Sequence, residues 1–344
     1  MSVDRRFHLL ITPTYFEKCH EYGLFGVSEA TMNQLANVCK GDIAFFYTTL
    51  KLKTRTVGRI YGPYEVMSNL FYNDQLVWAS SSADPHKDKY PYRIKLKLLD
   101  EHICLNPVPV QTLWDLKDEG KIKSIMDSSA LINKAVCNLL SEEGILLLQS
   151  LIQANQITSD DNSPYKGHSL TEHNVEVFKF RGRGVKEFRM ESHLETYLLL
   201  NQSKLHQLSG FPIGINEEYQ TYVLNQVSTY VAGGAIDIVC LYKKRVIDVW
   251  LILSAAVFEL KKGILEPTDL DQLIEYIEWA ARLIPGCKRE MTRGILIGRD
   301  FANKGDKCEA LLQHAKEIDK IYTIDIYEYR IDELSQNVIL DKIS

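Results

Sequence analysis

Hydrophobic and polar positions follow two different patterns along the chain, and the change falls near residue 155. In the first part, short apolar runs at 7–12, 43–47 and 56–61 are separated by Gly- and Pro-containing turns, and 94–98 alternates apolar and basic residues with a period of two. Residues 28–38 have the spacing of a helix. Many short strands with this punctuation predict a small β-barrel, followed by short helices up to about residue 153.

The second part alternates strands with longer helices. Two strongly apolar strands, joined by a hairpin at residues 242–245, are followed by an amphipathic helix at 267–284 that ends at Pro-Gly. This order predicts an α/β core with a mixed central sheet. The other expected elements are a helix at 190–200, a strand at 294–298, a helix at 306–318 and a strand at 321–327.

Length and composition fit two soluble domains. At 344 residues the chain is long for one core, and 45% hydrophobic with 25% charged residues is ordinary for a globular protein. Polar residues 155–174, broken by Pro164 and Gly167, predict a linker between domains at 1–154 and 175–344. We expect an α+β domain followed by an α/β domain.

Charge, cysteines and apolar runs exclude several classes. The net charge of -5 means that any surface for nucleic acid has to be local. Seven scattered cysteines without a Cys-x-x-Cys pair argue against a disulfide framework and a zinc site, and favour a cytoplasmic location. The longest apolar stretch, 249–258, is too short to span a bilayer, so no membrane partner is expected.

Two charged groups lie inside apolar strands of the second domain. Asp237 stands in Gly-Gly-Ala-Ile-Asp-Ile-Val, and Glu259 and Lys261 stand in Val-Phe-Glu-Leu-Lys-Lys-Gly. Alternation along a strand puts Glu259 and Lys261 on one face and Phe258 and Leu260 on the other. If the two strands are neighbours, Asp237 joins them, and two carboxylates beside one ammonium can hold a divalent metal. The alternative is that all three are exposed strand residues.

Two helices carry further candidates at the spacing of one turn. Gln272 and Tyr276 lie at i and i+4, on one face at the margin of the core, where they can reach the metal edge. Glu191 and Glu195 have the same spacing; we favour Glu195 as a ligand because it adjoins Leu194, and leave Glu191 open. For both pairs, a plain surface position is the alternative.

In this order, Glu195, Ile-Asp237, Glu259-Leu-Lys261 and Gln272-x-x-x-Tyr276 resemble the PD-(D/E)xK nuclease superfamily, especially archaeal and actinobacterial mismatch and branch endonucleases. The similarity covers roughly residues 187–300. It implies a restriction-endonuclease-like core in which Asp237, Glu259 and Glu195 hold Mg²⁺ or Mn²⁺ and Lys261 orients the attacking water. Gln272 and Tyr276 would support the site. The chain departs from the pattern with Ala235 in place of arginine and with a longer interval between Asp237 and Glu259, which indicates an extended hairpin.

A basic segment precedes this region. Five basic residues occur among eleven, with interleaved Phe and Gly, which is the best local candidate for contacts to phosphates. The alternative is a basic domain junction. The five are Lys179, Arg181, Arg183, Lys186 and Arg189.

The first domain also resembles a known family. Gly-x-Phe25-Gly-Val, Lys-Gly-Asp-Ile-x-Phe-x-Tyr47, Phe-Tyr72-x-Asp, Trp78 and Tyr-Pro-Tyr-Arg93-Ile are similar to an EVE domain, a PUA-like barrel related to YTH readers of methylated RNA. The resemblance implies an aromatic pocket for a flipped, modified base. Phe25, Tyr47, Tyr72 and Trp78 are its candidates, with barrel core as the alternative. Basic residues expected near phosphates are Lys51, Lys53, Arg55 and Arg93.

Together these patterns predict a metal-dependent DNA endonuclease that the first domain directs to modified DNA. One alternative is a structure-selective repair nuclease on mismatched or branched DNA, and another is a non-catalytic reader of modified nucleic acid. Cutting both strands needs two sites, which favours a homodimer. His168, His173 and His193 are interpreted as linker and surface residues rather than ligands.

Overall fold

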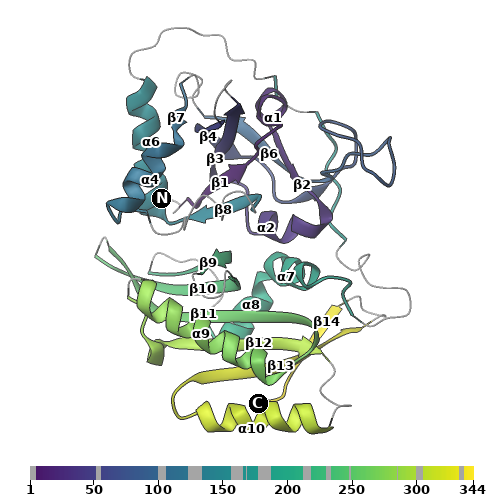
Figure 1. Ribbon diagram of the computed structural model, residues 1–344, viewed down its shortest axis with the longest axis vertical. Helices are drawn as coiled ribbons and strands as arrows, with labels where there is room; N and C mark the ends of the chain where they lie inside the picture. Colours follow the sequence, from purple (N-terminus) through teal and green to yellow (C-terminus); the bar gives the residue numbers. More distant parts are fainter. Residues whose placement is uncertain are drawn as a thin grey trace. The chain divides into compact units, whose positions relative to one another are not determined.

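The computed structural model describes residues 5–51, 56–99, 106–122, 134–155, 166–167, 169–176, 187–211, 218–229, 234–247, 249–284, 286–299, 305–332 and 337–344. The chain divides into two compact units, Met1–Val175 and Glu176–Ser344. Each unit contains one mixed sheet, curled as a half-barrel and accompanied by helices (Figure 1). The protein is therefore an α+β protein of two parts.

The sheet of the first unit has the strand order β2-β6-β4-β3-β1-β8, with β5 beside β6 and β7 beside β4. Its pairs are antiparallel except β1 and β3, which run parallel with Leu9 opposite Phe45. The strands are β1 (Phe7–Ile11), β2 (Leu24–Val27), β3 (Ile43–Lys51), β4 (Thr56–Val66), β5 (Phe71–Tyr72), β6 (Tyr92–Leu98), β7 (Val108–Pro109) and β8 (Val136–Leu139).

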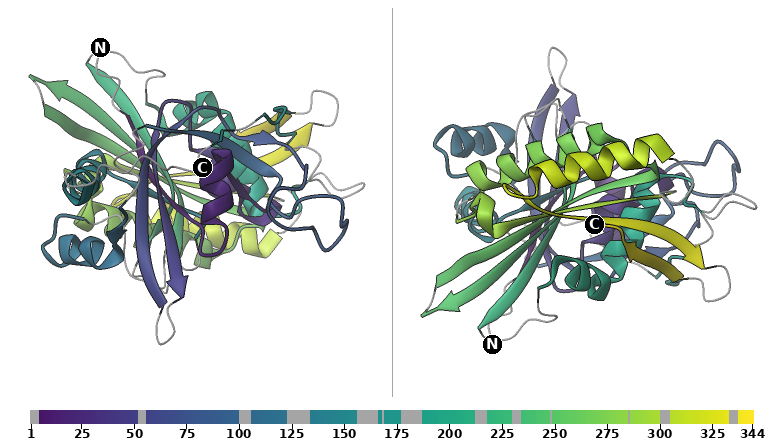
Figure 2. Two further views of the ribbon diagram at one scale, coloured as in Figure 1. Left: turned by 90° about the horizontal axis from the view of Figure 1, so that it is seen from above. Right: turned by 90° about the horizontal axis from the view of Figure 1, so that it is seen from below.

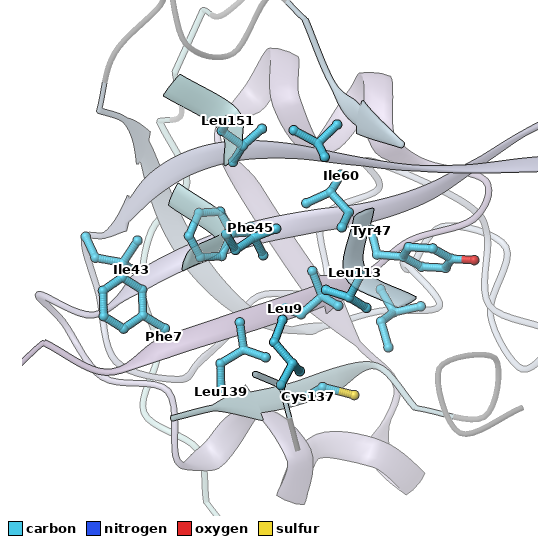
Figure 3. Close-up of a cluster of buried hydrophobic side chains, with 14 residues drawn as sticks. Phe7, Leu9, Ile43, Phe45, Tyr47, Ile60, Leu113, Cys137, Leu139 and Leu151 are labelled. Atoms are coloured by element: carbon cyan, nitrogen blue, oxygen red, sulfur yellow. The ribbon is translucent and has the colours of Figure 1, made fainter. Parts of the chain in front are cut away.

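Helices complete the core of the first unit. They are α1 (Phe16–Tyr22), η1 (Glu29–Thr31), α2 (Met32–Ala36), α4 (Val110–Asp118) and α6 (Ser141–Asn155). Apolar side chains of β1, β3 and β8 pack with Leu113 of α4 and with Leu147 and Leu151 of α6 (Figure 3). Tyr47 belongs to this cluster and is only 8% exposed.

The sheet of the second unit has the order β14-β13-β12-β11-β10-β9. Strands β11, β12 and β13 run parallel, and β9, β10 and β14 are antiparallel to their neighbours. This is a mixed sheet. The strands are β9 (Tyr219–Ser228), β10 (Ala235–Val246), β11 (Val249–Ile264), β12 (Thr292–Arg299), β13 (Thr323–Asp332) and β14 (Asn337–Lys342).

Four helices cover this sheet, with α9 and α10 on one side and α7 and α8 on the other (Figure 2). They are α7 (Glu191–Leu200), α8 (Gln202–Ser209), α9 (Pro267–Leu283) and α10 (Gly305–Ile318), with a short η3 (Arg289–Met291). Helix α9 begins at Pro267, and the Asp269 carboxylate accepts the N–H of Glu266 at 2.8 Å. Gly294 of β12 lets α9 approach closely, since a Cβ there would lie 2.8 Å from Ile277.

Several predicted boundaries are close and others are wrong. The helices expected at 190–200, 267–284 and 306–318 are present within two residues. The helix expected at 28–38 is a 3₁₀ turn followed by one short helix. The hairpin expected at 242–245 turns later, because Lys243 still pairs with Ile252 and Val246 pairs with Val249.

The described end of the expected linker packs on the first unit. His173 pairs with Tyr72, and the Lys166 ammonium lies 2.6 Å from the Glu21 carboxylate. Residues 156–165 and 168 lie outside the described residues. The interpretation of His168 as a linker or surface residue therefore stays a prediction. In the described part of the chain, no helix is long and apolar enough to cross a bilayer.

Candidate functional sites

Two of the acidic residues predicted from the sequence, Asp237 and Glu259, form one row across the neighbouring strands β10 and β11. The β10–β11 ladder reaches Ile238 opposite Phe258, and one further step in that register places Asp237 opposite Glu259. On the other side, the pairs Ile236–Val227 and Ile238–Asn225 place Asp237 level with Gln226 of β9. Both carboxylates are buried, with 9% of Asp237 and 2% of Glu259 exposed. The expectation that the two strands are neighbours is confirmed.

The strand opposite Asp237 is locally distorted. In the β9–β10 ladder the pairs on either side of Asp237 are made, but the Asp237–Gln226 pair is not. Gln226 has φ +51°, an unusual conformation for a residue with a side chain. Its amide Nε2 donates to Glu195 Oε2 at 2.8 Å and lies 3.4 Å from Asp237 Oδ1. The distortion thus links a helix carboxylate to a strand carboxylate.

Lys261 connects the carboxylate row to helix α9. Its Nζ donates to Glu259 Oε1 at 2.5 Å and to Gln272 Oε1 at 3.3 Å. The Gln272 amide in turn donates to the Tyr276 hydroxyl at 2.7 Å. Tyr276 is 1% exposed, so the alternative of a surface residue is wrong for it. Lys261, Gln272 and Tyr276 form one chain of hydrogen bonds that begins at Glu259.

Both candidate glutamates of α7 face this cluster. Glu195 is 2% exposed and accepts from Asn225 Nδ2 at 3.2 Å as well as from Gln226. Glu191 is less buried, and its charge acts on Asp237, Glu259 and Lys261. Both Glu191 and Glu195 therefore stay candidates for the helix ligand.

Crowding of carboxylates in a buried place disfavours their ionised forms. Burial, followed by the charges of Glu195, Glu259 and Glu191, raises the pKa of Asp237 well above its usual value. Burial raises the pKa of Glu259 to about 7 even though Lys261 opposes the shift. Burial alone would lower the pKa of Lys261, but Glu259 and Glu191 together raise it, so the lysine stays charged.

The residues present fit a divalent cation. Glu259 Oε2 is buried and accepts no hydrogen bond within the described residues. Such an orphaned acceptor beside like charges is the environment that a hard cation relieves. Among the residues that the structure describes, no three His, Cys, Asp or Glu side chains already converge as a metal site, because Lys261 and Gln226 bind the carboxylates instead.

Because the buried carboxylates repel one another, we expect neutralisation of one of them to raise the free energy of unfolding. A carboxyl whose pKa is raised by folding stabilises the protein below its ordinary pKa and loses that contribution as pH rises to the folded value. For Glu259 the loss falls between about pH 4.5 and about 7. Asp237→Asn should therefore raise the free energy of unfolding of metal-free protein at pH 8 by about 1 kcal/mol or more, and by less at pH 5.

Thermal unfolding in EDTA at the two pH values measures the difference. Glu290→Gln is the matched control, because Glu290 is exposed on η3. Equal effects of Asp237→Asn at pH 5 and pH 8 would show that charge crowding does not act on this site.

A second candidate site is a pocket of about 390 Å³ in the first unit. Two of the predicted aromatic residues, Phe25 and Trp78, line it. Tyr15 and Tyr90 also line it, with their ring centroids 5.9 Å apart in an edge arrangement. Polar and basic groups at the wall are Thr12, Ser28, Thr31, Lys89 and Lys134. Aromatic faces with a few polar groups suit a planar heterocycle.

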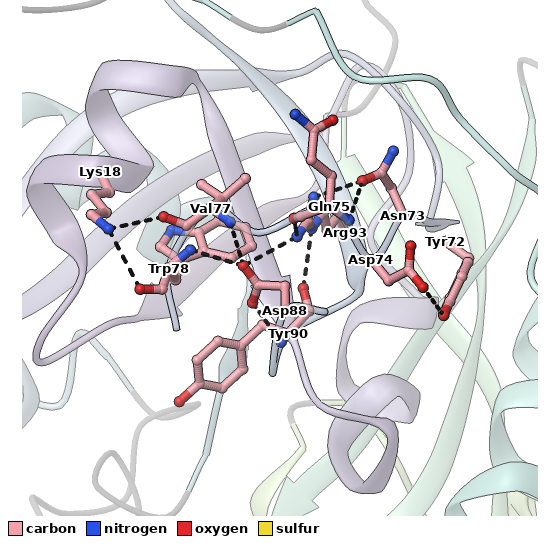
Figure 4. Close-up of polar contacts among 10 residues, drawn as sticks. All are labelled: Lys18, Tyr72, Asn73, Asp74, Gln75, Val77, Trp78, Asp88, Tyr90 and Arg93. Atoms are coloured by element: carbon pink, nitrogen blue, oxygen red, sulfur yellow. Dashed lines mark hydrogen bonds and ion pairs between the residues drawn. The ribbon is translucent and has the colours of Figure 1, made fainter. Parts of the chain in front are cut away.

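The wall that carries Trp78 and Tyr90 is fixed by a buried ion pair (Figure 4). Asp88 accepts the backbone N–H groups of Val77, Trp78 and Tyr90 at 2.6–2.8 Å. The Arg93 guanidinium lies 3.4 Å from Asp88, and both side chains are fully buried. Arg93 also lies 4.9 Å from the Trp78 ring centroid. Gly26 permits this packing, since a Cβ there would lie 2.7 Å from the Trp78 ring.

This placement corrects the expectation that Arg93 lies near phosphates. Its Nη1 donates to Asn73, and its Nη2 and Nε donate to the carbonyl oxygens of Gln75 and Tyr90. With no exposed surface, the guanidinium holds the pocket wall from behind.

The structure does not bring the other two predicted aromatics to the pocket. Tyr47 packs in the core with Phe45 and Ile60, which is the barrel-core alternative. The Tyr72 hydroxyl donates to Asp74 at 3.1 Å, outside the pocket lining. Only Phe25 and Trp78 keep the predicted position.

Most of the predicted basic residues cannot be placed. Arg189 is exposed, and its backbone oxygen accepts from Lys262. His173 is exposed, whereas His193 is fully buried in α7, so its interpretation as a surface residue is wrong. Lys53, Arg55, Lys179, Arg181, Arg183 and Lys186 lie outside the described residues, as does the side chain of Lys51.

Comparison of the sequence with known protein families and with curated proteins finds no match. The carboxylate row of the second unit and the aromatic pocket of the first unit are therefore the basis for the function of the protein. Sequence reasoning missed Gln226, Asn225 and Asp88, which are polar residues whose position depends on strand register and loop closure. Tyr90 was visible in Tyr-Pro-Tyr-Arg as a motif residue, but its side chain could not be assigned to the pocket.

Proposed function

We propose that this protein is a metal-dependent DNA endonuclease that its first unit directs to modified DNA. The observation that carries the proposal is the buried row of Asp237 and Glu259, with Lys261 attached and with one Glu259 oxygen that accepts no hydrogen bond from the described residues. A purely structural ion pair would satisfy that oxygen, because an unpaired buried carboxylate is costly. The same residues carry the resemblance to PD-(D/E)xK nucleases, which supports the proposal.

Asp237, Glu259 and Glu195 would hold Mg²⁺ or Mn²⁺. The cation would supply a Lewis acid for the phosphate and a water of lowered pKa. Lys261, which donates to Glu259, would orient the attacking water or stabilise charge on the phosphate. Gln272, fixed by the Tyr276 hydroxyl, keeps the Lys261 Nζ from turning away.

For the first unit we propose that the aromatic pocket takes a base extruded from DNA, in a PUA-like domain similar to EVE domains. Phe25, Trp78 and Tyr90 offer stacking surface, and the hydroxyls of Ser28 and Thr31 offer hydrogen bonds to base edges. Stacking and edge contacts offset the cost of extruding a base, about a few kcal/mol.

A cleavage panel tests the proposal. Wild-type protein with Mg²⁺ or Mn²⁺ is given duplexes that differ only in carrying modified cytosine, together with unmodified branched and mismatched duplexes. We expect cutting of the modified duplex and sparing of the unmodified one. Preferential cutting of branched or mismatched unmodified DNA would favour a repair nuclease. Tight binding of modified DNA without cutting in either metal would favour a non-catalytic reader.

A further inference from the structure

Strands β9, β10 and β11 extend past the core of their own unit as a ribbon, in which β9 pairs with β10 as far as Tyr219 opposite Lys244. From Tyr242 on β10 and up to Ser254 on β11, no described residue is buried. The strands nevertheless stay paired to the last position, Val246 opposite Val249. Figure 2 shows β10 and β11 running on together, with β9 beside them.

The end of the ribbon exposes apolar side chains. Ile247 is 88% exposed, Val249 59%, Leu251 46% and Val246 43%. Ile247 also has φ +60°, a conformation that a β-branched residue strongly disfavours and that Gly or Asn would adopt readily. An exposed isoleucine in a strained turn is unfavourable both for solubility and for folding, so its presence points to a contact.

Three consecutive basic residues, Lys243, Lys244 and Arg245, lie directly behind this apolar end. An aromatic cluster holds their strand. The Tyr219 and Tyr242 rings are parallel within 5° at 5.6 Å, the Lys243 ammonium lies 4.6 Å from the Tyr222 centroid, and that of Lys244 lies 5.3 Å from the Tyr219 centroid. The ribbon is therefore braced rather than loose.

We propose that this ribbon is a second DNA contact, in which Lys243, Lys244 and Arg245 contact phosphates and Ile247 inserts among the bases. The inference rests on the proposed function. An apolar side chain at the tip of a β-ribbon can act as a wedge between base steps, and the basic residues behind it can neutralise phosphates.

The ribbon also sets a distance. Asp237 and Val246 are nine positions apart on one strand, which is about 30 Å at ~3.3 Å per residue. That span is close to one turn of duplex, ~34 Å. The ribbon therefore contacts DNA about one turn from the bond that the metal centre cuts.

Binding of full-length Asp237→Asn protein to a 30-base-pair duplex tests the proposal without cleavage. In that background, Lys243→Ala/Lys244→Ala/Arg245→Ala should weaken binding at least about tenfold at 0.1 M salt and reduce the salt slope by up to ~3, since each phosphate contact contributes about 0.9. Lys316→Ala/Lys320→Ala, at exposed positions of α10 and just after it, should change neither.

Ile247→Gly tests the wedge and relieves the backbone strain, so loss of folding is not expected. It should abolish the rise in 2-aminopurine fluorescence that an unstacked base gives on binding. The matched control is Ile321→Gly, because Ile321 is 55% exposed. Shortening the duplex to less than one turn on either side of the cut should weaken binding of the parent and leave the triple variant unaffected.

The outcomes separate this inference from the nuclease proposal. If the protein binds DNA through the ribbon but never cuts it, the ribbon proposal stands and the nuclease proposal is wrong. Cleavage with hairpin variants that bind like their controls would overturn the ribbon alone. Hairpin variants that bind DNA normally but differ in sedimentation would also overturn it, because the ribbon would then contact a second copy. A change in binding to phosphatidylserine vesicles instead would indicate a membrane contact.

Discussion

Replacing Asp237 by asparagine is expected to lower metal-dependent DNA cleavage by at least about 10³-fold, because the metal contributes several kcal/mol to the transition state. The side chains are nearly isosteric, and asparagine can still accept the Leu260 N–H that now donates to Asp237 Oδ2 at 2.8 Å. The fold should therefore survive, and DNA binding with it.

Lys261→Met belongs to the same test. It removes the ammonium that contacts both Glu259 and Gln272, and should reduce the cleavage rate while Mn²⁺ still binds. Tyr276→Phe keeps the ring in the core and removes only the hydroxyl that accepts from Gln272, so its effect should be smaller. Cleavage at the wild-type rate by Asp237→Asn would exclude this row of carboxylates as the catalytic centre.

Asp88→Ala should destabilise the first unit by about 3–5 kcal/mol, because it leaves a fully buried guanidinium without its counter-ion. It also removes the acceptor of three backbone N–H groups in the loop that carries Trp78 and Tyr90. Chemical denaturation of the full chain measures this as a loss in the transition of that unit. Base recognition should fail together with it.

The matched control for Asp88 is Asp341→Ala. Asp341 pairs with Arg330 at 3.0 Å, but the two side chains are 49% and 61% exposed, so the cost should be less than about 1 kcal/mol. An equally small effect of Asp88→Ala would contradict the assignment of Arg93 and Asp88 as the support of the pocket wall.

The residues of the carboxylate row and of its α9 neighbours could be predicted because their signals are local. Apolar alternation places Glu259 and Lys261 on one face of a strand, and the i, i+4 spacing pairs Gln272 with Tyr276. The α9 helix was visible from its apolar stripe and from Pro267. Gln226 could not be predicted, because its role depends on one distorted position in the β9–β10 ladder. No periodicity in the sequence marks such a position.

Other errors have physical causes of the same kind. Lys243, Lys244 and Arg245 look like a turn, but cross-strand pairing and stacking on tyrosines keep them in β10. Arg93 looks like a surface cation, and only the folded loop supplies the buried Asp88 that neutralises it. Tyr47 is aromatic like Trp78, yet the parallel pairing of β1 with β3, distant in sequence, assigns it to the core.

A Mn²⁺ titration of full-length protein, followed by electron paramagnetic resonance, tests most directly whether the row of Asp237 and Glu259 binds a metal ion. We expect saturable binding to wild type that is tighter at pH 8 than at pH 6, since the raised carboxyl pKa values make Mn²⁺ compete with protons. Asp237→Asn should lose that binding, and Glu290→Gln should keep it. Equal binding by wild type and Asp237→Asn, or no saturable binding by either, would contradict a metal centre at this row of carboxylates.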